Sequence, residues 1–370
     1  MGIIFVKNHP LSRLIFTVTN DLSYDQRMQR IAGSLAVTGH DVLLVGRKLP
    51  GSVPLPSLSF RQRRLRCFFN TGFLFYAEYN LRLFFFLLFR RADIICAIDL
   101  DTILPVYFVS LLKRCKRVYD AHELFTEQKE VLSRPSILRF WLGIERFAVP
   151  RFPNGYTVNE ALAKEFRQRY KVNYGVIRNL PLTYPLTVAG PTEKFILYQG
   201  AVNHGRSFET LVPAMQQVRA PLHVYGTGNF IRETKALVAA YGLEQQIIFH
   251  DPLLPADLAV VTQQAFIGLT LFEAEGMNQF HSLANRFFDY IMAGTPQVCV
   301  NYPAYAAVNA EYGVALAIVD TKPGTIASAL NRLLEDADLH QTLKENCLRA
   351  REILNWENEE KLLLDFYKNL

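Results

Sequence analysis

The chain has 370 residues, of which 50% are hydrophobic and 20% charged, a balance typical of globular rather than disordered proteins. Because a single hydrophobic core rarely grows past about 250–300 residues, this length predicts two domains. The five cysteines are odd in number and form no C-x-x-C pair, which argues against a disulfide framework or a structural zinc site. Reduced thiols and the lack of a secretory signal pattern predict a cytoplasmic protein.

In the first half of the chain, short apolar runs alternate with helix-like stretches. Strands are predicted at 14–20, 41–46, 93–98, 116–120 and 155–159. The helix between the first two strands ends at Gly39, as a helix C-cap should.

A basic and aromatic segment, residues 61–91, separates the second and third predicted strands. Its charge comes mainly from Arg61, Arg63, Arg64, Arg66, Arg90 and Arg91. Polar residues interrupt the apolar run, which is therefore too short to span a bilayer. One interpretation is an interfacial helix with its aromatic side chains in the acyl boundary and its arginines on anionic headgroups. The other is a buried helix that follows a solvated basic loop.

In the second half the alternation restarts, with strands predicted at 194–200, 221–226, 246–250, 266–272, 296–300 and 314–320. Strands that alternate with helices form parallel sheets covered on both faces. The predicted fold is α/β, with two doubly wound Rossmann-like domains that face each other across a cleft. They comprise residues 1–181 and 194–355, joined by a linker at 182–193. The terminal helix, 356–370, is expected to cross back onto the first domain.

A histidine follows the strand predicted at 116–120. Ligands of open α/β sheets bind outside the carboxyl ends of the strands, so His122 is a candidate for the cleft. Asp120 and Glu123 could orient this ring or tune its pKa. The alternative is a polar loop that begins a helix.

A second polar constellation follows residue 278. A helix is predicted from about Leu283 to Gly294, with Asn285, Arg286 and Asp289 on one side. An arginine near a helix N-terminus is unfavourable unless an anion binds there, which suggests a diphosphate, while Asp289 could accept hydrogen bonds from ribose hydroxyls. The alternative is an exposed Arg286–Asp289 salt bridge worth less than about 1 kcal/mol.

Glycines mark the approach to the same predicted nucleotide site. Gly200 follows a strand, Arg206 opens the next helix, and Gly226 and Gly228 allow a backbone to approach a nucleotide. No third glycine follows at the spacing of a dinucleotide-binding loop, so a dehydrogenase is not supported.

Several segments together carry a family resemblance. "DLSYDQRMQRIAGSLAVTGHDVLLV", "ADIICAIDLDTILP", "YDAHELFTEQ", "YQGAVNHGRSFETL", "YGTGN" and "SLANRFFDYIMAGTPQV" occur in this order over nearly the whole chain. They resemble the group 1 family of retaining glycosyltransferases, which has the GT-B fold. The resemblance implies that His122 lies near the transferred sugar, Arg206 and Arg286 on the donor diphosphate, and Asp289 on the donor ribose.

The sequence departs from the family at some of these positions. The family usually has Lys in place of Arg286 and Glu in place of Asp289, and His281 replaces the first acid of its paired-glutamate motif. "TNDLSYDQR" replaces the glycine-rich loop after the first strand. Contacts with the acceptor are therefore assigned to Asp25 and Arg27, with Glu123 beside the histidine.

The resemblance implies a transferase that moves a sugar from a nucleotide-diphosphate donor to a lipid-linked or polysaccharide acceptor, with retention of configuration. No cofactor or metal is expected, because arginines and helix ends neutralise the diphosphate in this architecture. The Asp99-x-Asp101 pair is thus not expected to hold a metal. An anionic membrane surface is an expected partner, placing the protein on its cytoplasmic face; nucleic acid is not. The alternatives are a nucleotide-sugar epimerase and a non-catalytic binding subunit.

Overall fold

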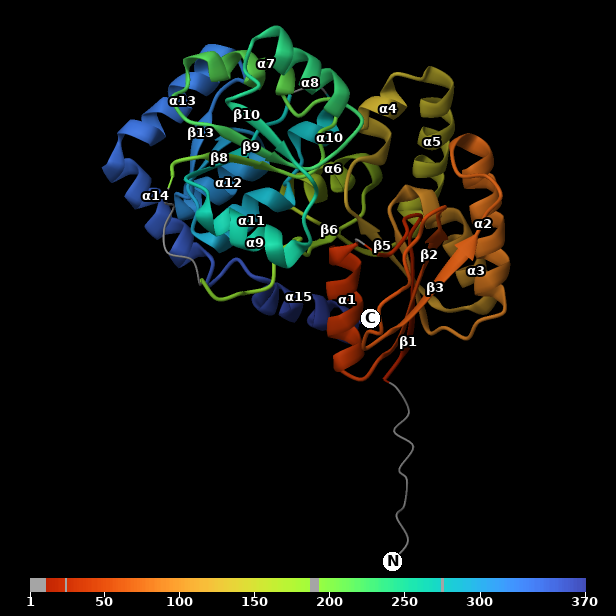
Figure 1. Ribbon diagram of the computed structural model, residues 1–370. Helices are drawn as coiled ribbons and strands as arrows, with labels where there is room; N and C mark the ends of the chain where they lie inside the picture. Colours follow the sequence, from red (N-terminus) through yellow and green to blue (C-terminus); the bar gives the residue numbers. More distant parts are fainter. Residues whose placement is uncertain (1–10, 24, 187–192, 274–275) are drawn as a thin grey trace, which may run out of the picture. The chain divides into compact units, whose positions relative to one another are not determined.

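The computed structural model describes residues 11–23, 25–186, 193–273 and 276–370 (Figure 1). They form two compact units, one made of the chain up to Arg178 together with Glu360–Leu370, and the other of Asn179–Glu359. Part of the predicted linker, residues 187–192, lies outside the described residues.

The first unit is built on a parallel seven-stranded sheet in the order β3-β2-β1-β4-β5-β6-β7. The strands are β1 (Arg13–Thr17), β2 (Asp41–Lys48), β3 (Arg61–Arg66), β4 (Ile94–Ile98), β5 (Lys116–Ala121), β6 (Asn154–Thr157) and β7 (Gly175–Val176). The helices are α1 (Gln26–Val37), α2 (Gly72–Leu88), α3 (Ile103–Lys113), α4 (Lys129–Leu132), α5 (Pro135–Ala148) and α6 (Glu160–Tyr170). All five strands predicted in this half are present.

Successive side chains of β1 explain the layering of this unit. Ile15 belongs to the core formed with α2, α3 and α5, which lie on one side of the sheet in Figure 1. Phe16 points to the other face, where its ring lies 5.9 Å from that of Tyr367. Both faces of the sheet are therefore buried, as the continuous apolar strands predicted.

The segment 61–91 contains the helix that both predictions gave it, preceded by a strand that neither prediction included. Its four clustered arginines lie in or at the ends of strand β3 rather than in a loop, and among the described strands β3 pairs only with β2. An edge strand tolerates charged side chains because one of its edges faces solvent, so it shows no apolar alternation in the sequence. Helix α2 buries Phe75, Tyr79, Leu83 and Leu87 on one face.

The opposite face of α2 is apolar as well. Its exposed side chains include Phe73, Leu74, Leu81 and Phe85. Within the described residues, no helix is long and apolar enough to cross a membrane.

The second unit is built on a parallel six-stranded sheet in the order β10-β9-β8-β11-β12-β13. The strands are β8 (Ile196–Gln199), β9 (Leu222–Tyr225), β10 (Ile247–His250), β11 (Ile267–Thr270), β12 (Gln297–Val300) and β13 (Ala315–Ile318). The helices are α7 (Phe208–Ala214), α8 (Ile231–Ala240), α9 (Pro255–Gln264), α10 (Met277–Phe280), α11 (Asn285–Ala293), α12 (Pro303–Tyr312), α13 (Pro323–Glu335) and α14 (Ala337–Ala350). Every strand predicted in this half is present.

The last helix, α15 (Trp356–Lys368), begins in the second unit and ends in the first. Near its start, the backbone N–H of Trp356 donates to Pro181 O at 2.8 Å. Near its end, Tyr367 is buried, and its hydroxyl lies 3.3 Å from that of Tyr156. The final residues are thus part of the core of the first unit.

Candidate functional site

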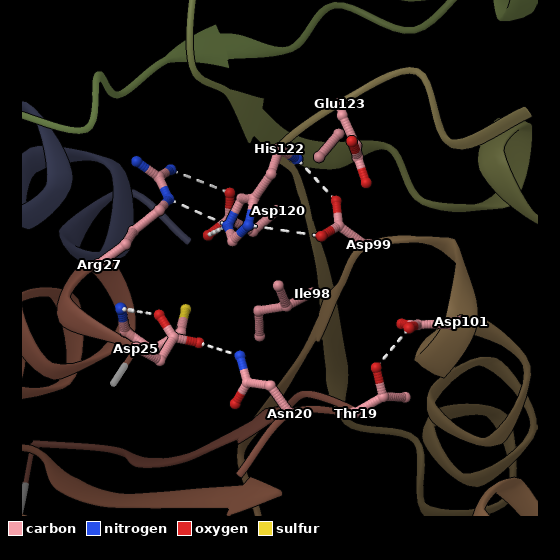
Figure 2. A network of polar contacts seen from close by, with 12 residues as sticks. Thr19, Asn20, Asp25, Arg27, Ile98, Asp99, Asp101, Asp120, His122 and Glu123 are labelled. Atoms are coloured by element: carbon pink, nitrogen blue, oxygen red, sulfur yellow. Dashed lines mark hydrogen bonds and ion pairs between the residues drawn. The ribbon is translucent and has the colours of Figure 1, made fainter. Parts of the chain in front are cut away.

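Two adjacent strand ends in the first unit bring Asp99 and His122 together. β4 and β5 pair in parallel and end at neighbouring positions, since Ile98 is in register with Asp120. The backbone N–H of Asp99 donates to Asp120 O at 3.0 Å, and that of His122 donates to Asp99 Oδ1 at 2.8 Å. Figure 2 shows the Asp99 carboxylate facing both the backbone and the ring of His122.

Asp99 has a strained backbone, with φ +54° and ψ 177°. Side chains disfavour this conformation, which costs on the order of 1–3 kcal/mol and persists only where surrounding contacts enforce it. The hydrogen bonds to Asp120 and His122 are those contacts. In the sequence, Asp99 stands out only as part of an Asp-x-Asp pair, a pattern that gives no signal of its link to His122.

A buried arginine from α1 holds the other side of the ring. Arg27 is 4% exposed, and its Nη2 donates to Asp120 Oδ1 at 3.0 Å. Its Nη1 donates to Ile177 O at 3.0 Å, and its Nε lies 3.0 Å from His122 Nε2 (Figure 2). Arg27 therefore positions the histidine, and its guanidinium is largely occupied by groups of its own unit.

The His122 ring has a different set of partners in each charge state. In the neutral ring, Nδ1–H faces Asp99 Oδ2 at 3.4 Å while Nε2 accepts from Arg27. In the protonated ring, Nε2–H donates instead to Asp120 Oδ2, which lies 3.1 Å away. Burial alone lowers the pKa of His122, but the carboxylates of Asp120 and Asp99 outweigh it and raise the pKa to about 9. Burial raises the pKa of Asp99 to about 8, opposed by His122.

We expect this pair to make the stability of the protein fall as the pH rises. The folded pKa of His122, about 9, lies above its ordinary value of 6.5, so the ring's contribution is complete below pH 6.5 and lost by pH 9. The raised pKa of Asp99 acts in the same direction, because the folded state keeps a proton that the unfolded chain releases. The free energy of unfolding should fall by on the order of 3–5 kcal/mol between pH 6.5 and 9, with His122 as the larger contributor.

Urea unfolding measured across this pH range tests the expectation. The double variant Asp99→Asn/His122→Gln should show a flatter profile, and asparagine tolerates the positive φ of Asp99. If the free energy of unfolding fell equally steeply with pH in the wild type and the variant, protonation of Asp99 and His122 would not be coupled to stability.

The remaining predicted residues of this unit have separate partners. Asp25 caps α1, because its Oδ1 accepts from the backbone N–H of Met28 at 3.0 Å. Glu123 accepts a hydrogen bond from Gln128. Asp101 accepts one from Thr19, and burial raises its pKa to about 6.

Asp99 and Asp101 face different groups, the former His122 and the latter Thr19 (Figure 2). Among the residues that the structure describes, no group of three or more His, Cys, Asp or Glu side chains could hold a metal ion.

In the second unit, two predicted arginines converge on one aromatic ring. The guanidinium carbon of Arg206 lies 4.4 Å from the ring centre of Phe272, and that of Arg286 lies 5.2 Å from the same centre. Arg286 also covers the ring of Tyr198 at 4.4 Å. Phe272 and Tyr198 were not predicted, because apolar strand ends carry no sequence signal of such a role. The two rings hold two cations near each other.

Arg286 is not half of an exposed salt bridge. Its residue is only 7% exposed, and within the described part of the chain its buried Nη1 has no hydrogen-bond partner. A buried guanidinium with an unused donor is unfavourable unless a ligand completes it. Helix α11 begins at Asn285, slightly later than predicted, and no side chain of the described residues caps it. The positive end of the helix dipole and the Arg286 guanidinium together suit an anion.

Glycines let the backbone approach this position closely. A Cβ on Gly200, whose φ is +114°, would lie 4.0 Å from Arg286 Cζ. A Cβ on Gly226 would lie 1.9 Å from Gly200 O, and one on Gly228 would lie 2.3 Å from Val202 O. The loops after β8 and β9 are therefore packed backbone against backbone, which only glycine permits.

Asp289 lies one turn after Arg286 on α11. Its Oδ2 accepts from Gln199 Nε2 at 3.1 Å, and Gln199 Oε1 accepts from Thr262 Oγ1 at 2.7 Å. This relay fixes the carboxylate from the carboxyl end of β8. Asn285 is exposed, and its Oδ1 accepts from Asn179 Nδ2 at 2.7 Å.

The second unit also carries the sequence match. Residues 187–349 match the family model of glycosyl transferases group 1. The match lies within Asn179–Glu359, the unit that brings Arg206 and Arg286 together. No curated protein matches the chain.

Solved structures show that the fold is GT-B. Sucrose-phosphate synthase from Thermosynechococcus elongatus is 17% identical, with a TM-score of 0.78 over 96% of this chain and 98% of that one. WaaG, a glycosyltransferase involved in lipopolysaccharide biosynthesis, is 17% identical, with a TM-score of 0.73 over 95% and 98%. Anabaena HepE in complex with UDP-glucose is 12% identical, with a TM-score of 0.72 over 97% and 100%. The chain thus shares the GT-B fold of two Rossmann-like domains.

Proposed function

We propose that this protein is a retaining glycosyltransferase that moves a sugar from a nucleotide-diphosphate donor to a glycan or lipid-linked acceptor. The observation that carries the proposal is the pair of guanidinium groups on Phe272, one of which, on Arg286, is buried with an unused donor. The family match of residues 187–349 supports it. So does the neighbour HepE, which was solved with UDP-glucose.

The two arginines act on the leaving group. Departure of a nucleoside diphosphate develops negative charge, and fixed cations in a water-poor site stabilise that charge more in the transition state than in the ground state. Gly200, Gly226 and Gly228 admit the diphosphate to the backbone, and Asp289 takes the ribose.

In the first unit, His122 acts at the transferred sugar. The carboxylates around it are already engaged: Asp120 is wholly buried and bonded to Arg27, and Asp99 holds His122. Neither is free to attack the sugar. Retention is therefore assigned to a front-face transfer, in which the acceptor attacks as the diphosphate leaves and the departing phosphate takes the acceptor proton.

The acceptor side is assigned to the partly exposed Asp25 and Glu123, whereas Arg27 contributes through His122. A lipid-linked acceptor would bring the protein to an anionic membrane surface on its cytoplasmic side. The sugar is supplied by the donor, and no further cofactor is part of the proposal.

Asp289 provides the test of the donor site. Each charge-assisted hydrogen bond to a ribose hydroxyl contributes about 1.5–3 kcal/mol, so Asp289→Ala should weaken nucleoside diphosphate binding by at least about tenfold. Asp289→Glu keeps the charge and should have a much smaller effect. Isothermal titration with the nucleoside diphosphate that most raises the Tm measures both.

A 2′,3′-dideoxy nucleoside diphosphate is the control ligand. It should bind the wild type weakly and lose little more affinity on Asp289→Ala, since its hydroxyls are absent. If Asp289→Ala binds both ligands as the wild type does, the carboxylate does not contact the ribose and the donor site is misplaced.

A further inference from the structure

The arginines of β3 fall into two groups that the sequence does not distinguish. Arg61 Nη2 pairs with Asp41 Oδ1 at 2.7 Å, and Arg64 Nη2 pairs with Asp21 Oδ1 at 2.7 Å. Arg64 is also bonded to the carbonyl oxygen of Val53. These two arginines hold the edge of the sheet in place.

The other two have no such partner. Arg63 and Arg66 are exposed and, like Lys48 at the end of β2, have neither an ion pair nor a side-chain hydrogen bond within the described ranges. Lys48 is in register with Arg66 across the β2–β3 pair. Like charges on adjacent strand positions are destabilising, and a bound anion removes that penalty.

These three cations line one cavity. It has a volume of about 780 Å³ and is also lined by Arg82 and Phe85 of α2. Arg82 is paired with Glu78 at 2.7 Å, so Lys48, Arg63 and Arg66 supply the uncompensated charge. A cavity with several converging basic groups is suited to phosphate oxygens.

Phe85 lines this basic cavity, and two further exposed aromatic side chains follow it on the chain or contact its lining. Phe85 is 50% exposed, Phe89 one turn later is 81% exposed, and Phe68, over whose ring Arg82 lies at 5.1 Å, is 84% exposed. A soluble phosphate compound has no apolar region in which these exposed rings could be buried. A bilayer does, because its acyl boundary accepts aromatic side chains directly beneath the phosphate groups.

We propose that the cavity formed by Lys48, Arg63, Arg66 and Phe85 binds the phosphate group of an anionic lipid headgroup, with Phe68 and Phe89 inserted beside it. This site is separate from the donor-binding residues of the second unit. Its role, to bring the protein to a lipid-linked acceptor, rests on the proposed function, whereas the binding itself does not. A different role for the charges, keeping an edge strand from pairing with another chain, requires neither the cavity nor the exposed rings.

Vesicle co-sedimentation of the full chain tests the proposal. The wild type should bind vesicles of 30% phosphatidylglycerol in phosphatidylcholine, prepared at about 0.1 M salt, and not vesicles of phosphatidylcholine alone. Each basic residue at an anionic surface strengthens binding about fivefold, so Arg63→Ser/Arg66→Ser should weaken it about thirtyfold. The control Arg219→Ser/Arg332→Ser removes the same charge from exposed positions of the second unit and should change binding less than about twofold.

A second pair of variants separates lipid from other anions. Phe85→Ser/Phe89→Ser should weaken vesicle binding at least about tenfold, since each exposed ring leaves the acyl boundary, and leave retention of the protein on a polyphosphate resin unchanged. Equal loss in both assays, or a wild type that binds the resin but not the vesicles, would overturn the lipid assignment. The site would be overturned if Arg63→Ser/Arg66→Ser bound vesicles as tightly as the wild type. It would also be overturned if the control Arg219→Ser/Arg332→Ser weakened vesicle binding as much as Arg63→Ser/Arg66→Ser does.

The outcome is independent of transferase activity. Melting curves test whether these surface variants fold, and their affinity for nucleoside diphosphates should equal that of the wild type. Loss of vesicle binding with unchanged nucleotide affinity supports the site even if no turnover is found. Failure of the proposed function would instead appear in the Asp289 and Arg286 variants.

Discussion

His122→Ala should lower turnover by about 10²–10⁴-fold, the usual range for removing a group that transfers or orients a proton at the reacting centre. Affinity for the nucleoside diphosphate should change by less than about twofold, because Arg206, Arg286 and Asp289 all belong to the other unit. Initial rates with a nucleotide-sugar donor, together with titration of the nucleoside diphosphate, measure the two quantities separately.

His122→Asn is the companion variant. It retains a side-chain N–H that can reach Asp99, and so separates loss of the ring from collapse of the strand end. Both variants should be equally inactive if ring chemistry is needed, and asparagine should be the more stable. Turnover near that of the wild type in either variant would remove His122 from the active site.

The second large effect is expected at Arg286. Arg286→Met keeps an unbranched side chain over Tyr198 and Phe272 but removes the charge. Since charge-assisted hydrogen bonds contribute about 1.5–3 kcal/mol each, two lost bonds should weaken nucleoside diphosphate binding about a hundredfold or more. Arg286→Lys keeps the charge but not the planar fork, and a loss of about tenfold is expected.

The stability of Arg286→Met without ligand is a control for structural damage, because this substitution should not destabilise the protein. Replacing a buried, incompletely bonded cation by an apolar side chain of similar length is often neutral or stabilising. We therefore expect the Tm of Arg286→Met to equal or exceed that of the wild type. The corresponding nucleoside without phosphates should bind both proteins alike. A methionine variant that is less stable and binds the diphosphate normally would show that Arg286 has a structural role.

Periodicity was sufficient to predict most of the fold. Buried parallel strands read as continuous apolar runs, so β1 and β8 were located within a few residues. β3 was missed because its sequence, RQRRLR, has only one apolar residue. Its strand conformation comes from pairing with β2, a tertiary interaction that local propensity does not report.

The candidate site shows the same division. Strand ends and helix starts pointed to His122 and Arg286. Their companions were invisible in the sequence: Asp99 is strained by contacts with the next strand, and Phe272 is one apolar residue among many. Whether Arg61 or Arg63 is free depends on where Asp41 lies in space, although the two arginines are only two positions apart in sequence.

The path of α15 has a consequence for how the protein is made. The core of the first unit includes Tyr367, which packs against Phe16 of β1 and Tyr156 of β6. During synthesis the strands of this unit emerge first, yet the part of the sheet around Phe16 and Tyr156 lacks the cover of Tyr367 until the last eleven residues, Glu360–Leu370, have followed some 180 residues later. The second unit, whose chain is continuous, can complete its own core earlier. Although it comes first in the sequence, the first unit is therefore the last to be finished.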